Sequence, residues 1–232
     1  MAAFETDLPT FTTILPFSKK EVKFRPFRVK EEKVLLMANA GDNIKDVTDA
    51  VENIVEACTN GAVTASNSSM FDMQHMWLML RGKSVSEELD FYVTCACEYH
   101  NELTANVEDF KFRQTPGHSM TIDLGHYTVE MRYPTFEDYG MLYEINTVDA
   151  VMEVVANCMT RIVTVEEVKL NTPDTASEFR EFLDNITPAQ FKKLEAFFST
   201  MPVLEYVAKY TCKGCGAEKE VTIDGVRSFF AS

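Results

Sequence analysis

Four of the six cysteines come in two close pairs, and paired cysteine thiolates are the ligands that structural zinc sites most often use. One pair is Cys212 and Cys215, followed by Gly216, and the other is Cys95 and Cys97. Alternating apolar and polar residues flank each pair, which predicts a strand, a cysteine turn and a return strand twice over. If the two turns face each other, the four thiolates would bind one structural zinc ion.

Alternatives stay open at these cysteines. His100 could replace one of the thiolates. Cys95 and Cys97 are separated by one residue rather than the usual two, which strains their binding to the same ion. The two cysteine turns could therefore also form without metal. A redox pair at Cys212 and Cys215 is the less favoured alternative, since reactive cysteines of that kind lie at helix N-termini and strands flank this pair.

The sequence offers no spacing that is typical of an active site. Its four histidines do not form a HExxH motif, and no Gly-x-Ser-x-Gly elbow is present. Gly82-Lys83-Ser84 is similar to the end of a phosphate-binding loop, but Trp77 stands where that loop needs its first glycine. We therefore expect a protein that is not an enzyme and has no small-molecule substrate, and we expect Trp77 to be part of the core.

Composition predicts an ordinary globular protein with an acidic surface. The 232 residues are 46% hydrophobic and 25% charged, with a formal net charge of −14. Such a charge disfavours nucleic acid as a partner, because phosphate binding depends on lysine and arginine. With no apolar run of about 18 residues and no secretory signal, we also expect no membrane partner and reduced cytosolic cysteines.

The basic residues are concentrated in a short stretch near the N-terminus. Residues 19–33 hold seven of the chain's 22 basic residues and only three acidic ones. The stretch begins as an extended segment, where Pro26 restricts it to an edge strand or a docked arm, and continues as a helix from about Lys30. Intramolecular pairing of its arginines with the acidic body is the alternative to partner binding. The residues predicted to bind a partner are Lys23, Arg25, Phe27 and Arg28, with Phe229 and Phe230 at the far end of the chain.

The elements expected to position these residues form an α+β fold. We predict a mainly helical body with small antiparallel β-hairpins, one of which could form a zinc-ribbon-like knuckle. The segment from Thr187 to Gln190 is a typical helix start, with a hydroxyl cap and a proline in the first turn. The expected parts, together one compact unit, are an N-terminal arm or hairpin (1–28), a helical part (29–88), a small antiparallel sheet (89–134) and a helical part ending in the cysteine-knuckle hairpin (135–232).

Two stretches carry a resemblance to a known family. The sequence FRPFRVKEEKVLLMA at residues 24–38 resembles the N-terminal signature of the T4-type bacteriophage baseplate hub and hub assembly proteins. A second match lies in the Cys-x-x-Cys-Gly segment and the terminal Gly-Val-x-x-Phe-Phe. The resemblance implies a structural or assembly protein of a contractile tail baseplate.

Such a protein would bind other phage baseplate and tail proteins. It would be found in the virion, and in the host cytoplasm during assembly. The resemblance does not distinguish a permanent subunit from a transient assembly factor. A zinc-ribbon adaptor outside a virion, and a thiol redox enzyme, are the functional alternatives.

Overall fold

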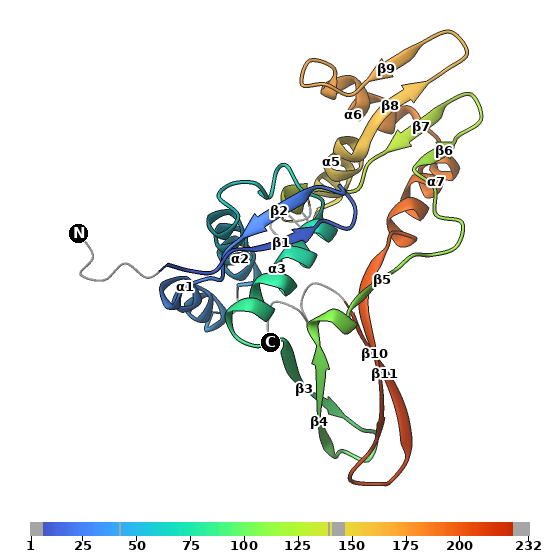
Figure 1. Ribbon diagram of the computed structural model, residues 1–232. Coiled ribbons are helices and arrows are strands. Elements are labelled where there is room, and N and C mark those ends of the chain that lie inside the picture. Colours follow the sequence, from blue (N-terminus) through green and yellow to red (C-terminus); the bar gives the residue numbers. More distant parts are fainter. Residues whose placement is uncertain (1–6, 42, 139, 141–146, 225–232) are drawn as a thin grey trace. The chain divides into compact units, whose positions relative to one another are not determined.

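The computed structural model describes residues 7–41, 43–138, 140 and 147–224. Its contacts divide the chain into two compact units (Figure 1). Unit 1 contains residues 1–113 together with 203–232, and unit 2 contains residues 114–202. Unit 1 is therefore discontinuous in sequence, and its last strands must find partners that lie far away along the chain.

Unit 1 begins with a short hairpin that leads into three helices. The bounds are β1 Phe11–Ile14, β2 Glu21–Phe24, α1 Val29–Asn39, α2 Ile44–Cys58 and α3 Met70–Ser84. Helix α3 is largely buried and includes Trp77, which is only 1% exposed. The Ser69 hydroxyl caps α3 by accepting from the backbone N–H of Asp72. The Asp72 carboxylate in turn accepts from the backbone N–H groups of Phe17 and Ser18, which fixes the hairpin turn against α3.

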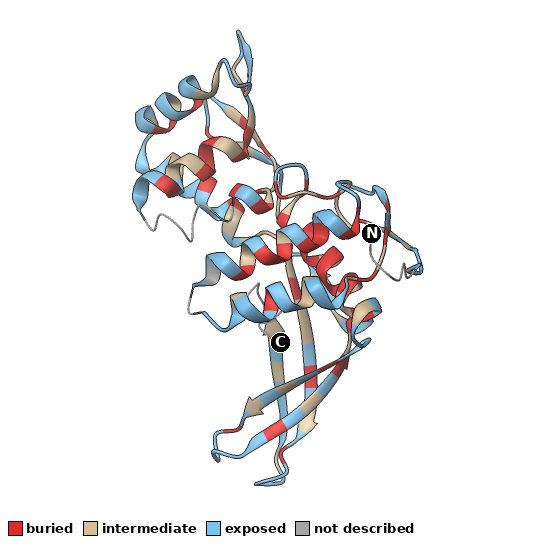
Figure 2. Ribbon diagram, turned by 90° about the vertical axis from the view of Figure 1, so that its left-hand side faces the viewer, coloured by how far each residue is buried: buried red, intermediate tan, exposed pale blue. Residues whose placement is uncertain are grey.

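Two longer hairpins complete unit 1 and pack against each other (Figure 1). Buried and exposed positions alternate along their strands, so buried residues form isolated red bands in Figure 2. Between the hairpins, the Tyr206 ring packs against Phe91 and Phe110, with centroid distances of 6.0 and 5.3 Å. The bounds are β3 Glu88–Thr94, β4 His100–Asn106, the 3-10 turn Val107–Asp109, β5 Lys111–Arg113, β10 Val203–Thr211 and β11 Glu218–Asp224.

Unit 2 combines a four-stranded antiparallel sheet with helices. Its sheet has the order β6-β7-β8-β9. The core includes Met159, Phe179 and Leu194, all of which are fully buried. The Thr187 cap is present as predicted, with reciprocal bonds between Thr187 and Gln190 at the start of the last helix. The bounds are β6 Thr121–Asp123, β7 Thr128–Met131, β8 Met159–Val163, β9 Val168–Leu170, α5 Val148–Cys158, α6 Ala176–Asn185 and α7 Pro188–Ser199.

The prediction of a mainly helical α+β body is wrong, because the structure is a mixture of helices and strands. The described residues form eleven strands in four sheets, and they are 38% helical and 27% strand. Part of the error lies at Met159 and Ile162, whose spacing from Val155 fits a continuing helix. The helix instead ends at Cys158, and β8 forms because β7 and β9 offer it partners on both edges. Tertiary pairing here overrides local periodicity.

The described helices are also unlike membrane spans. None of them combines the length and the apolar character that crossing a bilayer requires.

Candidate metal centre

The two cysteine turns lie at the ends of the two long hairpins of unit 1. Cys95 and Cys97 follow β3, and Cys212 and Cys215 follow β10. Although more than a hundred residues separate the pairs in sequence, their four sulfur atoms all lie within 4.8 Å of one another. The structure thus brings together the four cysteines that the sequence singled out.

The distances between the sulfur atoms fit a shared metal ion rather than disulfides. The Sγ atoms of Cys95 and Cys215 are 3.9 Å apart, and those of Cys97 and Cys212 are 3.6 Å apart. A disulfide needs about 2.05 Å between sulfurs, so neither pair is bonded. Four sulfurs placed tetrahedrally about 2.3 Å from one zinc ion would be about 3.8 Å apart. The two separations measured across the turns, 3.9 and 3.6 Å, are close to that value.

Backbone hydrogen bonds give the two turns a similar shape. In the first turn the Glu98 N–H donates to the Cys95 carbonyl, and in the second the Gly216 N–H donates to the Cys212 carbonyl. Each turn also places a residue in the left-handed region, with φ of +66° at Glu98 and +72° at Gly216. This conformation reverses the chain tightly, so that both cysteines of a turn reach the same point.

Asn101 joins the two hairpins at the cysteine cluster. Its side chain is 2% exposed and faces inward from β4. Its Oδ1 accepts from the backbone N–H of Lys213 at 2.9 Å, and its Nδ2 lies 3.5 Å from the Cys212 Sγ. Sequence reasoning missed this residue. The available signal was an amide at a position of β4 whose neighbours on the same face, Leu103 and Ala105, are apolar.

The turn backbone also favours a thiolate at Cys212. Hydrogen bonds from the backbone N–H of Cys215 and from Asn101 lower the pKa of the Cys212 thiol to about 6. At Cys97 the Tyr99 backbone acts in the same direction, but loss of hydration and the neighbouring thiols outweigh it and raise the pKa to about 11. Four thiols this close cannot all ionise without a cation, whereas a divalent metal would favour all four thiolates.

The remaining candidates for chemistry lie outside this cluster. His100 is exposed, and its Nδ1 is 3.0 Å from the Thr94 hydroxyl on the outer face of the β3–β4 hairpin. It does not belong to the group of ligand atoms that converge among the described residues. Cys58 and Cys158 are buried on helices, and burial raises the pKa of their thiols to about 11 and 12.

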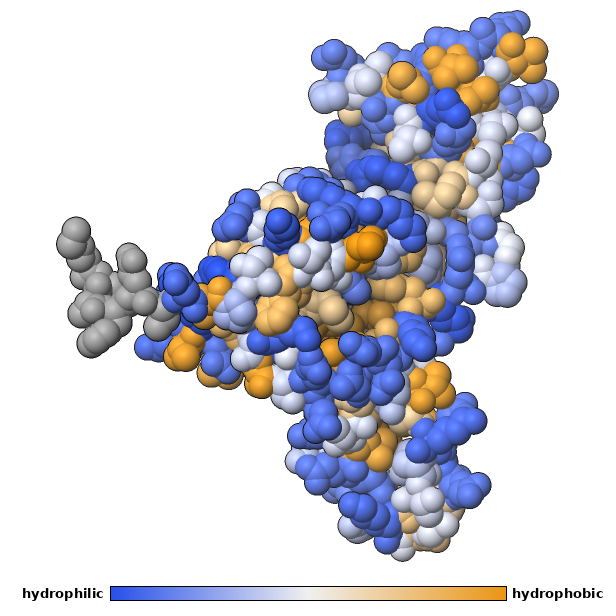
Figure 3. Space-filling model, in the orientation of Figure 1, coloured by the Kyte–Doolittle hydropathy of each residue, from blue (hydrophilic) through white to orange (hydrophobic). Residues whose placement is uncertain are grey.

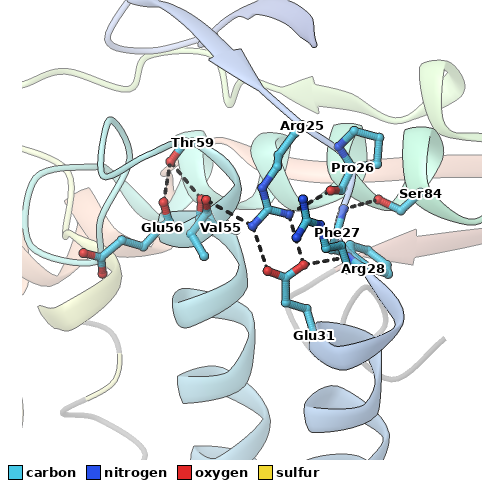
Figure 4. A network of polar contacts seen from close by, with 10 residues as sticks. Arg25, Pro26, Phe27, Arg28, Glu31, Val55, Glu56, Thr59 and Ser84 are labelled. Carbon is cyan, nitrogen blue, oxygen red and sulfur yellow. Dashed lines mark hydrogen bonds and ion pairs between the residues drawn. The ribbon is translucent and has the colours of Figure 1, made fainter. Parts of the chain in front are cut away.

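Within the basic stretch of residues 19–33 (the cationic arm), Arg25 pairs with another residue of the same chain. Its guanidinium forms two hydrogen bonds with the Glu31 carboxylate, at 2.7 and 3.1 Å (Figure 4). The bond to Glu31 raises the pKa of Arg25. The backbone N–H of Arg28 donates to the same carboxylate at 2.6 Å, so Glu31 fixes the start of α1.

The other predicted docking residues differ in how accessible they are. Phe27 stacks on Trp77 with ring centroids 6.1 Å apart, and its backbone N–H donates to the Ser84 hydroxyl. Lys23 and Arg28 have exposed side chains and, with Arg25, line a recess of about 210 Å³. Phe229 and Phe230 lie outside the described residues.

Comparison with known proteins identifies the family. A profile of the family described as T4 bacteriophage base plate protein matches residues 8–231, nearly the whole chain. No curated protein and no solved structure matches significantly. The matched region contains both cysteine turns and the cationic arm. The chain therefore belongs to the family of T4 bacteriophage base plate proteins.

Proposed function

We propose that the protein is a non-enzymatic structural or assembly component of the baseplate hub that acts by binding other tail proteins. Family membership over nearly the whole chain is the observation that carries this proposal. The geometry is consistent with it, because the four sulfur atoms of the cysteine cluster converge between two hairpins, as the ligands of a structural ion do. A structural metal would occupy all four sulfur ligands, so the protein would act through its surface, by binding other proteins.

Within this function, Cys95, Cys97, Cys212 and Cys215 would bind one zinc ion. The ion would join the β3–β4 hairpin to the β10–β11 hairpin at the ends farthest from their connections to the helices. The sulfur separations and the lowered pKa of Cys212 support this assignment. Since structural zinc sites stabilise the folded state directly, the ion would keep the two hairpins together as a single surface.

Metal analysis of the purified chain tests the zinc assignment. We expect one zinc per chain in the wild type and less than half of that in Cys212→Ser. Cys58→Ser is the matched control, because Cys58 is also buried but lies outside the cluster. Full zinc content in Cys212→Ser would rule out the assignment.

Mass spectrometry of purified virions tests the role in the tail. A structural component should be present in intact particles, whereas an assembly factor should be bound to tail intermediates in infected cells and absent from virions. If the chain associates with neither virions nor intermediates, the proposed function is incorrect.

A further inference from the structure

Helix α1 has an apolar face that points away from the protein. Val29, Lys33, Leu36 and Met37 follow the spacing i, i+4, i+7 and i+8, which places them on one side of a helix. A surface helix normally buries such a face. Here Val29 is 79% exposed, Leu36 is 61% exposed and Met37 is 68% exposed. Hydrophobic side chains are visible on the surface over α1 in Figure 3.

The opposite side of α1 is the one fixed to the rest of unit 1. Leu35 is the residue of α1 that is buried, and α1 packs against α2. The paired bonds between Arg25 and Glu31 hold the first turn of the helix in this orientation. A rotation of α1 that buried Leu36 and Met37 would break these bonds and expose Leu35, so the apolar face is held outward.

Cationic side chains lie on this face and next to it in sequence. Lys33 is part of the face, and Arg28 and Lys30 stand on either side of Val29 in the sequence. All three are exposed, and none of them forms an ion pair with a described residue. Three cations elsewhere on the protein, Arg113, Arg161 and Lys169, are instead paired with glutamates. On a chain with a net charge of −14, a group of unpaired cations around exposed apolar residues is a local reversal of sign.

We propose that the outward face of α1 inserts into an apolar groove edged by carboxylates on another baseplate protein. Helix-in-groove recognition uses this spacing of apolar anchors, and the cations around it would select a partner with an acidic rim. The inference rests on the proposed function, since it assumes that the chain binds other tail proteins. It moves the main contact from Arg25 and Phe27, which are engaged internally, to Val29, Leu36 and Met37.

Two described recesses of unit 1 would not offer α1 a matching groove on a second copy of the chain. These two recesses, of about 520 and 440 Å³, are lined by residues of both charge signs. Lys209, Glu218 and Glu220 line the first, and Lys111, Arg113 and Glu205 line the second. Neither recess is the apolar groove with an acidic rim that α1 would need.

The test compares two pairs of substitutions that have similar exposure and chemistry. Leu36→Glu with Met37→Glu changes the α1 face. Val165→Glu with Val168→Glu changes apolar residues of unit 2 that are 102% and 55% exposed. Each tagged full-length chain is produced during phage infection, and the co-purified phage tail proteins are identified and quantified. We expect the α1 variant to capture at least about tenfold less of the main tail protein, and the unit 2 variant to match the wild type. Unchanged circular dichroism and zinc content would show that both variants fold.

Each other outcome contradicts a stated part of the proposal. If the wild type captures tail proteins and the α1 variant captures as much, α1 is not the contact, although the proposed function stands. If the wild type captures none, the proposed function itself fails.

Sedimentation and vesicle binding with the purified chain test whether a second copy or a lipid surface binds the α1 face instead. A dimer, or binding to phosphatidylglycerol vesicles, that is lost in the α1 variant would replace the groove with a second copy or a lipid surface.

Discussion

Gly214 marks the point where the two cysteine turns touch. A Cβ atom at this position would lie 2.6 Å from the Cβ and 2.8 Å from the Cγ of Tyr99, closer than carbon atoms can approach. Tyr99 belongs to the first cysteine turn and Gly214 to the second, so any side chain here would push the two turns apart. The close approach makes a glycine necessary for bringing the sulfur atoms together.

We therefore predict that Gly214→Ala weakens metal binding. The expected result is at least about tenfold lower zinc affinity in competition with a chromogenic chelator, since ligands displaced by less than an ångström lose much of their affinity. Gly216→Ala is a contrasting variant. Its added Cβ would meet no atom within 4 Å, and its cost is only the strain of φ +72°, about 1 kcal/mol. Adding Tyr99→Ala to Gly214→Ala should not restore zinc affinity, because the Cβ atom at position 99 remains. Adding Tyr99→Gly removes that atom and should restore the affinity.

The lowered pKa of Asp138 makes the folding stability of unit 2 depend on pH. Burial disfavours its charge, but hydrogen bonds from Arg132 at 2.7 Å and from the Thr135 backbone at 2.8 Å outweigh that and lower its pKa. A carboxyl group with a lowered pKa in the folded state stabilises the fold fully above its unfolded pKa of about 3.9. That stabilisation disappears as the pH falls through the folded pKa.

We expect Asp138→Asn to be less stable than the wild type at pH 7, with the difference narrowing as the pH falls below about 4. Urea unfolding followed by circular dichroism at several pH values measures this difference. Asp174→Asn is a suitable control, because Asp174 is exposed and forms no ion pair with a described residue. A difference that stays constant down to pH 2 would show that the charge of Asp138 is not what stabilises this segment.

Local chemistry explains which site residues the sequence could predict. The cysteines were predictable because each pair and its flanking strands lie within a few residues. Thr187 was predictable as a cap because its bonds reach only three residues ahead. Asn101 was not, since its main partner, the Lys213 backbone, is 112 residues away and an inward amide alone does not identify a partner.

At the scale of elements, neighbouring residues of strand β10 lie on opposite faces of its sheet and differ in burial. Ala208 is 4% exposed on the side that faces the β3–β4 hairpin, whereas its neighbour Val207 is 42% exposed on the other side. Because side chains alternate along a strand, an identical substitution at the two positions should have very different effects.

We predict that Ala208→Asp lowers the free energy of unfolding by about 2 kcal/mol or more, since it buries a charge without a partner. Val207→Asp should cost less than about 1 kcal/mol. Denaturant unfolding followed by the fluorescence of Trp77, the single tryptophan, measures both values in unit 1. Equal costs at the two positions would mean that the hairpins do not pack as described.

Helix α1 and strand β8 show where local patterns mislead. The spacing of Val29, Leu36 and Met37 is that of a core-facing helix, yet the Arg25–Glu31 pair holds that face outward. In β8, the pattern of a helix gives way to a strand at Met159 because two neighbouring strands are available for pairing. In β8 the deciding contacts come from strands outside the local window. In α1 the deciding ion pair spans only six residues, but the helical spacing of the apolar residues does not reveal it.

For the whole molecule, the division into two units predicts two separable responses to metal removal. The four cysteines and Trp77 all belong to unit 1, whereas residues 114–202 contain none of these. A chelator should therefore lower the temperature at which Trp77 fluorescence reports unfolding. Calorimetry should show a second transition, from unit 2, that does not move. If the chelator shifts both transitions equally, the units do not unfold independently.

The strands on either side of unit 2 meet in one sheet of unit 1. Arg113, the last residue of β5, is the direct partner of Val203, the first residue of β10. The chain therefore leaves this sheet and returns to it at adjacent positions. The segment inserted between these two positions can change in length without disturbing the neighbouring strands. Over phage evolution, residues gained or lost between positions 113 and 203 would be tolerated by unit 1, so baseplate proteins of this family should differ most in length at this point.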